Sequence, residues 1–155
     1  MEQSIEQLFN IAEVDLVYRS KGKAADRPRV TTSRDCYAIL KQAWDWNKID
    51  LLEQFKILLL DRRNSCIGIA DIGTGGVTGC VADPKIMFAI ALKARATGMI
   101  MAHNHPSGAL VPSQADVDLT RKMTQAGKYL DIGVVDHVIM TSESYYSFAD
   151  EGLIP

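Results

Sequence analysis

The chain has few of the features that mark secreted, membrane or disulfide-stabilised proteins. Its three cysteines, Cys36, Cys66 and Cys80, form neither an even set nor a CxxC pair, so we expect free thiols in a reducing cytoplasm. No uncharged apolar run approaches the roughly 18 residues that a membrane span needs, so we expect no membrane association. Residues 1–11 carry two glutamates and lack a basic start before an apolar core, so we expect that they are not a secretory signal.

Excess charge of one sign is also lacking. Lys and Arg number 17 against 19 Asp and Glu, and the formal net charge of −2 argues against strong nucleic-acid affinity of the whole chain. Basic residues are nevertheless concentrated in 19–34, where Asp26 is the single acid. Such a stretch can contact phosphates, so association with DNA stays open, although a solvated loop is the simpler interpretation. The basic residues are Arg19, Lys21, Lys23, Arg27, Arg29 and Arg34.

Length and composition are those of one ordinary globular domain. The 155 residues are 47% hydrophobic and 23% charged, and they are too few for a TIM barrel, which needs roughly 200 or more. Predicted strands alternate with predicted helices, which indicates an α/β or α+β layered domain. Helices are expected at 1–12, 34–46, from Asp83-Pro84 to Gly98, and from Ser113 to Ala126. Strands are expected at 14–19, 53–60, 66–72, 77–81, 99–102 and 134–140, with a hairpin joining the second and third and a bend at 73–76.

Two tryptophans lie at the end of the helix expected over 34–46. Trp44 and Trp46 are two residues apart, so they cannot share one face of that helix. A stacking platform for bases is conceivable for them. Packing against the sheet is the favoured interpretation.

The most informative segment follows the strand expected at 99–102. His103 and His105 are separated by one residue, and in extended backbone such residues point to the same face, so both imidazoles could reach one ion. The next loop contains prolines and a glycine, and it can return the chain so that Asp116 adds a third ligand. Two imidazoles and one carboxylate leave a fourth tetrahedral position for water, which is typical of a catalytic zinc site.

Each candidate residue also has a structural interpretation that spacing leaves open. Ser113 and Asp116 fit a capping box and could simply begin a helix. Glu53 opens an apolar strand and could move protons at a zinc site, or it could be a carboxylate at the sheet edge. His137 could be a further ligand, but its apolar neighbours favour a hydrogen-bonded core histidine.

The spacing of these residues resembles a known family signature. His103-Asn104-His105-Pro106, six residues, Ser113, two residues and Asp116 resemble the JAMM signature, H-x-H-P-x6-S-x2-D, of JAB/MPN metallohydrolase domains. The flanks are similar to the bacterial RadC-like branch, with similarity from about Thr31 to Ile154. We therefore expect a short extension at 1–30, holding a helix, a strand and a basic loop, followed by a RadC-like JAB/MPN domain at 31–155. The flanking matches are the HNHPSG run, Pro112, Thr120, Asp136-His137 and Ser147-Phe148.

The resemblance implies a fold, a cofactor and a role for each matched residue. The fold is a mixed β-sheet flanked by helices, related to the cytidine deaminase-like architecture. The cofactor is Zn²⁺, with His103, His105 and Asp116 as ligands. Glu53 matches the glutamate that moves the proton of the attacking water, and Ser113 matches the serine that stabilises the oxyanion. The implied activity is zinc-dependent hydrolysis of an amide bond, in a peptide, an isopeptide or a small amide.

Two other functions are compatible with parts of the sequence pattern to different degrees. A DNA-associated accessory or repair module would depend on the basic segment 19–34, but longer RadC-type proteins carry a helical N-terminal region for which 155 residues leave no room. A nucleobase deaminase would need H-x-E and P-C-x-x-C elements. Neither is present, because Asn104 and His105 follow His103 and no two cysteines are three apart.

Overall fold

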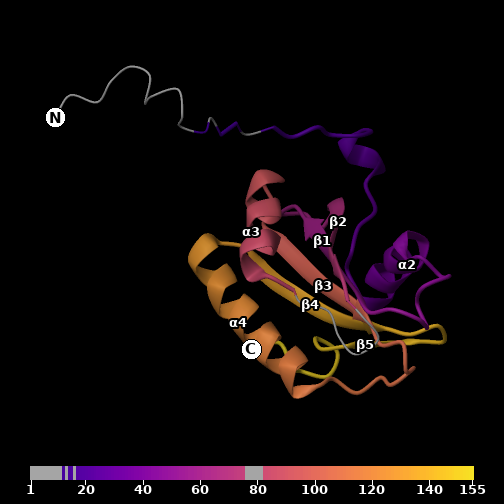
Figure 1. Ribbon diagram of the computed structural model, residues 1–155. Coiled ribbons are helices and arrows are strands. Elements are labelled where there is room, and N and C mark those ends of the chain that lie inside the picture. The colour runs from indigo at the N-terminus through magenta and orange to yellow at the C-terminus, as the bar shows by residue number, and fades with distance from the viewer. Residues whose placement is uncertain (1–11, 13, 16, 76–81) are drawn as a thin grey trace.

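A five-stranded mixed sheet organises the molecule, as Figure 1 shows. The structure is a computed structural model that describes residues 12, 14–15, 17–75 and 82–155. The strand order is β2-β1-β3-β4-β5. The elements are η1 (Ala24–Asp26), α2 (Ser33–Ala43), β1 (Gln54–Leu60), β2 (Cys66–Thr74), α3 (Pro84–Lys93), β3 (Gly98–Asn104), α4 (Gln114–Leu130), β4 (Gly133–Met140) and β5 (Tyr145–Ser147).

The strand directions bring two distant segments to the same edge of the sheet. β1 runs antiparallel to β3, and Phe55 pairs with His103. The beginning of β1 therefore lies beside the end of β3. Because β3 and β4 are parallel, the chain must cross over between them, and α4 makes that crossover. The β1–β2 and β4–β5 pairs are antiparallel, so the sheet is mixed, as expected.

Apolar side chains cover both faces of the sheet. On one face, buried residues of α3 and α4 such as Phe88 and Met123 pack on Ile57 and Met101. On the other face, Leu40 of α2 packs with residues of β1, β3 and β4. Alternation along β3 thus divides its side chains between the two layers, with Met99 and Met101 on one side and Ile100 and Ala102 on the other. Figure 1 shows α2 on one side of the sheet and α3 and α4 on the other.

Three helices begin at the capping residues that their local sequences provide. Thr32 and Ser113 each form a capping box with the acid three residues later, in α2 and α4. Asp83 accepts a hydrogen bond from the backbone N–H of Lys85, and a proline occupies the first turn of α3. The expected starts of α3 and α4 are confirmed. α2 begins one residue earlier than expected, because Thr32 rather than Ser33 is the cap.

Several predicted element boundaries are wrong. α2 ends at Ala43 rather than at residue 46, since Trp44 turns into extended backbone and becomes buried in the core. Trp46 is 44% exposed, and its indole N–H donates to the carbonyl of Lys41. α3 ends at Lys93, and Gly98 instead opens β3. β2 continues through Gly73 and Thr74, where a bend was expected.

The predicted strand at 14–19 is also wrong for the residues that the structure describes there. Positions 14–15 and 17–19 form no strand, and Val14 is 90% exposed, so no apolar face is buried to hold one. The helix expected at 1–12 lies outside the described residues except for Ala12, which is not helical. The strand expected at 77–81 lies outside them as well. Among the described segments, no helix is long and apolar enough to cross a membrane.

Candidate metal centre

His103 and His105 point to one place at the carboxyl end of β3. His103 is fully buried, whereas His105 lies just beyond the strand and is partly exposed. The backbone N–H of His105 donates to the carbonyl of Met140, which continues the β3–β4 pairing for one more residue. Extended backbone is thereby maintained across the pair, and the two Nε2 atoms lie 3.0 Å apart. The predicted convergence of these two rings is confirmed.

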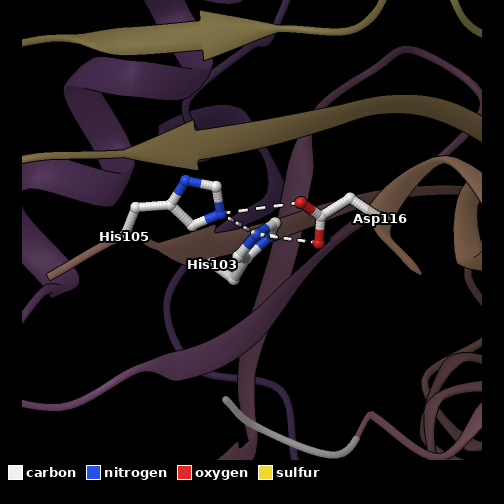
Figure 2. Close-up of side chains that lie close together, drawn as sticks. All are labelled: His103, His105 and Asp116. Atoms are coloured by element: carbon white, nitrogen blue, oxygen red, sulfur yellow. Dashed lines mark hydrogen bonds and ion pairs between the residues drawn. The ribbon is translucent and has the colours of Figure 1, made fainter. Parts of the chain in front are cut away.

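Asp116 reaches the same place from the first turn of α4. One carboxylate oxygen lies 3.2 Å from Nε2 of His103, and the other lies 3.5 Å from Nε2 of His105 (Figure 2). The same carboxylate accepts a 2.7 Å hydrogen bond from the backbone N–H of Ser113, as a capping box requires. The capping and ligand interpretations of Asp116 are therefore compatible, because its carboxylate contacts the Ser113 N–H and the two histidine rings at the same time.

The contacts of His105 leave an acceptor pointing at that carboxylate. Nδ1 of His105 lies 2.7 Å from the carbonyl oxygen of Ala109, which can only accept, so Nδ1 carries a hydrogen. In the neutral ring Nε2 then holds a lone pair that faces Asp116. When the ring is protonated, Nε2 instead donates a hydrogen bond to Asp116, and this hydrogen bond raises the pKa of His105. Burial would raise the pKa of Asp116, but the hydrogen bonds that the rings of His103 and His105 donate when they are protonated outweigh burial and hold that pKa well below its usual value.

The donor set fits a divalent metal ion. One nitrogen each from His103 and His105 and one oxygen from Asp116 lie within 4.8 Å of one another. Facing lone pairs and a carboxylate repel one another unless a cation lies among them, and nitrogen and oxygen ligands of this kind suit zinc. These three residues could therefore hold a metal ion.

A surface groove of about 370 Å³ opens on this cluster. Glu53 and Ser113 line it together with His105 and Asp116, and the loop at 106–111 forms a further part of the wall. Glu53 lies here because it precedes β1, whose first residues pair with the end of β3. The hydroxyl oxygen of Ser113 accepts from the backbone N–H of Asp116, which leaves the hydroxyl hydrogen available to a ligand in the groove. All five predicted site residues thus lie at or beneath one groove.

His137 is a buried histidine with hydrogen-bonding partners, as expected, but its partners were not foreseen. Its Nε2 atom lies 2.9 Å from Nδ1 of His103, and its Nδ1 atom lies 2.7 Å from Oγ1 of Thr120. Burial, and then the proximity of His103, lower the pKa of His137 well below its ordinary value. The sequence carries no signal for this pairing, because it depends on how β4 and α4 pack beside β3.

Asn104 also has a role that the sequence reasoning missed. It is fully buried, and its amide donates to the carbonyls of Ile49 and Leu52 at 2.6 and 2.8 Å. Its carbonyl accepts the backbone N–H of Gln54 at 2.8 Å. The residue between the two histidines therefore anchors the segment that carries Glu53. Its place in an H-x-H motif was the only signal that could have drawn attention to it.

Comparison with known proteins agrees with these observations. A family model described as "RadC-like JAB domain" matches residues 30–153. The chain is 41% identical over 127 residues to a UPF0758 protein of Flavobacterium johnsoniae, covering 81% of this chain and 53% of the relative. It is 40% identical over 102 residues to the UPF0758 protein YkfG of Escherichia coli, covering 66% and 65%. The chain spans about half the length of the first curated relatives, and their names state no activity.

Proposed function

Because the chain belongs to the family of RadC-like JAB domains, we propose that it is a zinc-dependent hydrolase of an amide bond. The observation that carries this proposal is the convergence of two imidazoles and a carboxylate on one point beside a groove that Glu53 also lines. A closed structural zinc site has four protein ligands, whereas this cluster offers three and opens to the groove. That arrangement favours catalysis over a purely structural metal.

His103, His105 and Asp116 would hold the ion. The chemistry that zinc supplies in such sites is a lowered pKa of a coordinated water and polarisation of a carbonyl group. Glu53 acts as the general base and then as the general acid, taking a proton from the attacking water and passing it to the leaving amine. The Ser113 hydroxyl donates a hydrogen bond to the oxyanion that develops on the substrate carbonyl.

The substrate in this proposal is a peptide, an isopeptide or a small amide. The groove is open to solvent and is bordered by the exposed side chain of Val111, so an extended chain could approach it. We also propose a reducing, cytoplasmic setting. That setting is supported by Cys36 and Cys66, which are free thiols.

Cleavage of a peptide library tests the proposal. Zinc-loaded protein is incubated with mixed linear and lysine-branched peptides, and new termini are counted by mass spectrometry. We expect the wild-type protein to release amines about 10²- to 10⁴-fold faster than the Glu53→Gln variant, because the variant cannot carry out the proton transfer. Glu143→Gln is the matched control, because Glu143 is exposed and is not among the residues that line the groove.

Two results would contradict the proposal. One is a zinc-loaded wild-type protein that cleaves no member of the library faster than Glu53→Gln does. The other is cleavage that persists unchanged after zinc is removed by a chelator. Equal zinc content in the wild-type and Glu53→Gln proteins must be established first, because only then does the rate difference report on proton transfer.

Association with DNA is a second candidate, favoured by one observation. Arg27, Arg29 and Arg63 line a shallow depression of about 430 Å³. None of these three guanidinium groups has an ion pair within 4.0 Å among the described residues. Binding there would weaken steeply with salt. A mobility-shift assay at low salt with the wild type and Arg29→Gln tests it, and the absence of any shift with single-stranded, duplex and forked DNA would exclude it.

A further inference from the structure

Thr120 and His137 form a buried hydrogen-bonded chain behind the metal ligands. The chain runs from the backbone carbonyl of Asp116 to the Thr120 hydroxyl at 2.7 Å, from there to Nδ1 of His137 at 2.7 Å, and from Nε2 of His137 to Nδ1 of His103 at 2.9 Å. Thr120 and His137 are both buried. This series of hydrogen bonds therefore links the backbone of Asp116, one proposed ligand, to the ring of His103, another.

The hydrogens in this chain can run in only one direction when the rings are neutral. The carbonyl of Asp116 can only accept, so the Thr120 hydroxyl spends its single hydrogen there. Toward His137 the same hydroxyl oxygen must then accept, which places a hydrogen on Nδ1 of that ring. Nε2 of His137 therefore holds a lone pair.

The direction set by Thr120 determines the tautomer of His103. Nε2 of His137 accepts, so Nδ1 of His103 carries the hydrogen and donates it. Nε2 of His103 is left with a lone pair that points toward His105 and Asp116. Full burial of the His137 ring agrees with a neutral imidazole, because a buried cation would lose its hydration.

We propose that His137, held by Thr120, is a positioning residue that fixes His103 in the Nδ1–H tautomer and so presents Nε2 to the metal. The inference rests on the proposed function for the metal site itself. His137 does not join the ligand set, since its Nε2 atom is directed at the far side of the His103 ring. Partners behind metal-bound histidines orient the ring and increase its basicity, and losing one typically costs about 10- to 100-fold in metal affinity.

Zinc affinity, measured by competition with a chromophoric chelator, tests this role. His137→Phe keeps a ring between Phe148 and Phe55 but removes both nitrogens, and we expect about 10- to 100-fold weaker binding. His137→Gln offers an amide oxygen that can accept from His103 and an N–H that can donate to Thr120, so we expect it to recover most of the affinity. A merely structural role would give the opposite order, because Phe preserves the aromatic packing better than Gln does.

Two threonines on α4 provide a second, matched pair of variants. Thr120→Val removes the hydroxyl that orients His137 at nearly constant volume, and we expect weaker zinc binding. Thr124 lies one turn later and is also buried, but its hydroxyl has no hydrogen-bonding partner among the described residues. Thr124→Val is therefore expected to leave zinc affinity unchanged. This pair keeps the test decisive even if His137→Phe fails to fold.

The imidazole ¹⁵N shifts of metal-free protein give a readout that needs no zinc. We expect His103 as the Nδ1–H tautomer in the wild type and a mixture of tautomers in Thr120→Val. An Nε2–H tautomer of His103 in the wild type would overturn the inference, as would equal zinc affinity in the wild type and a folded His137→Phe. A wild-type protein that shows the Nδ1–H tautomer but binds no zinc would instead contradict the proposed function.

Discussion

At the scale of single residues, Asp116 shows how a structural and a chemical signal can coincide. The pattern Ser113-x-x-Asp116 predicted either a helix cap or a ligand, and the structure gives the carboxylate contacts of both kinds. The convergence of His103 and His105 could be predicted because it depends only on local backbone geometry. The positions of Asn104 and His137 could not, because their partners lie 17 to 55 residues away in the chain.

Replacing Asp116 by Asn separates its two roles. The side-chain oxygen of Asn can still accept the Ser113 N–H, so this hydrogen bond of the capping box at the start of α4 is kept. The anionic ligand is lost, so zinc affinity should fall by more than the roughly 10- to 100-fold that an indirect partner contributes. Calorimetric titration with zinc measures it. Asp118→Asn, at an exposed acid on the same helix, should bind zinc like the wild type.

At the scale of elements, starts were easier to predict than ends. Thr32, Asp83 and Ser113 begin their helices through local hydrogen bonds that the sequence displays. The end of α2 at Ala43 depends instead on burial of Trp44 against the sheet, which is a tertiary contact. Similarly, α3 is apolar nearly all round, so its sequence could not show that Ile86 and Leu92 face solvent while Met87 is buried.

The cap of α2 should make stability depend on pH. Asp35 accepts hydrogen bonds from the backbone N–H of Thr31, from the Thr31 hydroxyl and from the backbone N–H of Thr32, and these lower its pKa to about 2. A lowered pKa in the folded state stabilises the fold above the ordinary value near 3.8, and this contribution is lost as pH falls through about 2.

Comparing urea denaturation of the wild type and Asp35→Asn at several pH values measures that contribution. The difference in free energy of unfolding should be constant at neutral pH and should shrink between about pH 4 and pH 2. A difference that stays constant over this range would contradict the assignment of the Asp35 contacts.

The turn between α4 and β4 leaves no room for a side chain at Gly127. A Cβ there would collide with the backbone carbonyl oxygen of Ile132. Ile132 cannot easily move away, because its backbone N–H donates a hydrogen bond to the Gly127 carbonyl. Alanine normally stabilises a helix by about 1 kcal/mol relative to glycine. Here we expect Gly127→Ala to destabilise the protein by about 1–3 kcal/mol in thermal or urea denaturation. Gly133→Ala, where the added Cβ meets nothing within 4 Å, is the control and should change little.

At the scale of the whole molecule, the class of fold was predictable and the arrangement of the sheet was not. Alternating strands and helices indicated a layered α/β domain, and the mixed sheet followed from the resemblance. The order β2-β1-β3-β4-β5 depends on pairing between distant segments, which propensities do not encode. That order nevertheless explains the candidate site, since pairing of β1 with β3 brings Glu53 beside the histidines.

The two faces of the sheet should contribute separately to stability and to metal binding. Leu40 of α2 is fully buried on the face opposite the candidate site, so Leu40→Ala should reduce the free energy of unfolding by about 2–5 kcal/mol. The zinc affinity of the folded protein should stay unchanged. Leu92→Ala, at a half-exposed leucine of α3, is the control and should change stability by only about 0.5 kcal/mol. A large loss of zinc affinity in folded Leu40→Ala would contradict this prediction, because it would show that packing on one face of the sheet affects metal binding on the other.

The most direct test of the central claim is the metal content of the purified protein. Wild-type protein and His105→Ala are equilibrated with zinc, freed of unbound metal by gel filtration and analysed by elemental emission, with circular dichroism to confirm that both are folded. His105 is the suitable position because its ring is partly exposed and lies just past β3. Our account predicts about one zinc per chain in the wild type and close to none in the variant. Folded wild-type protein without zinc, or equal zinc in both proteins, would contradict it.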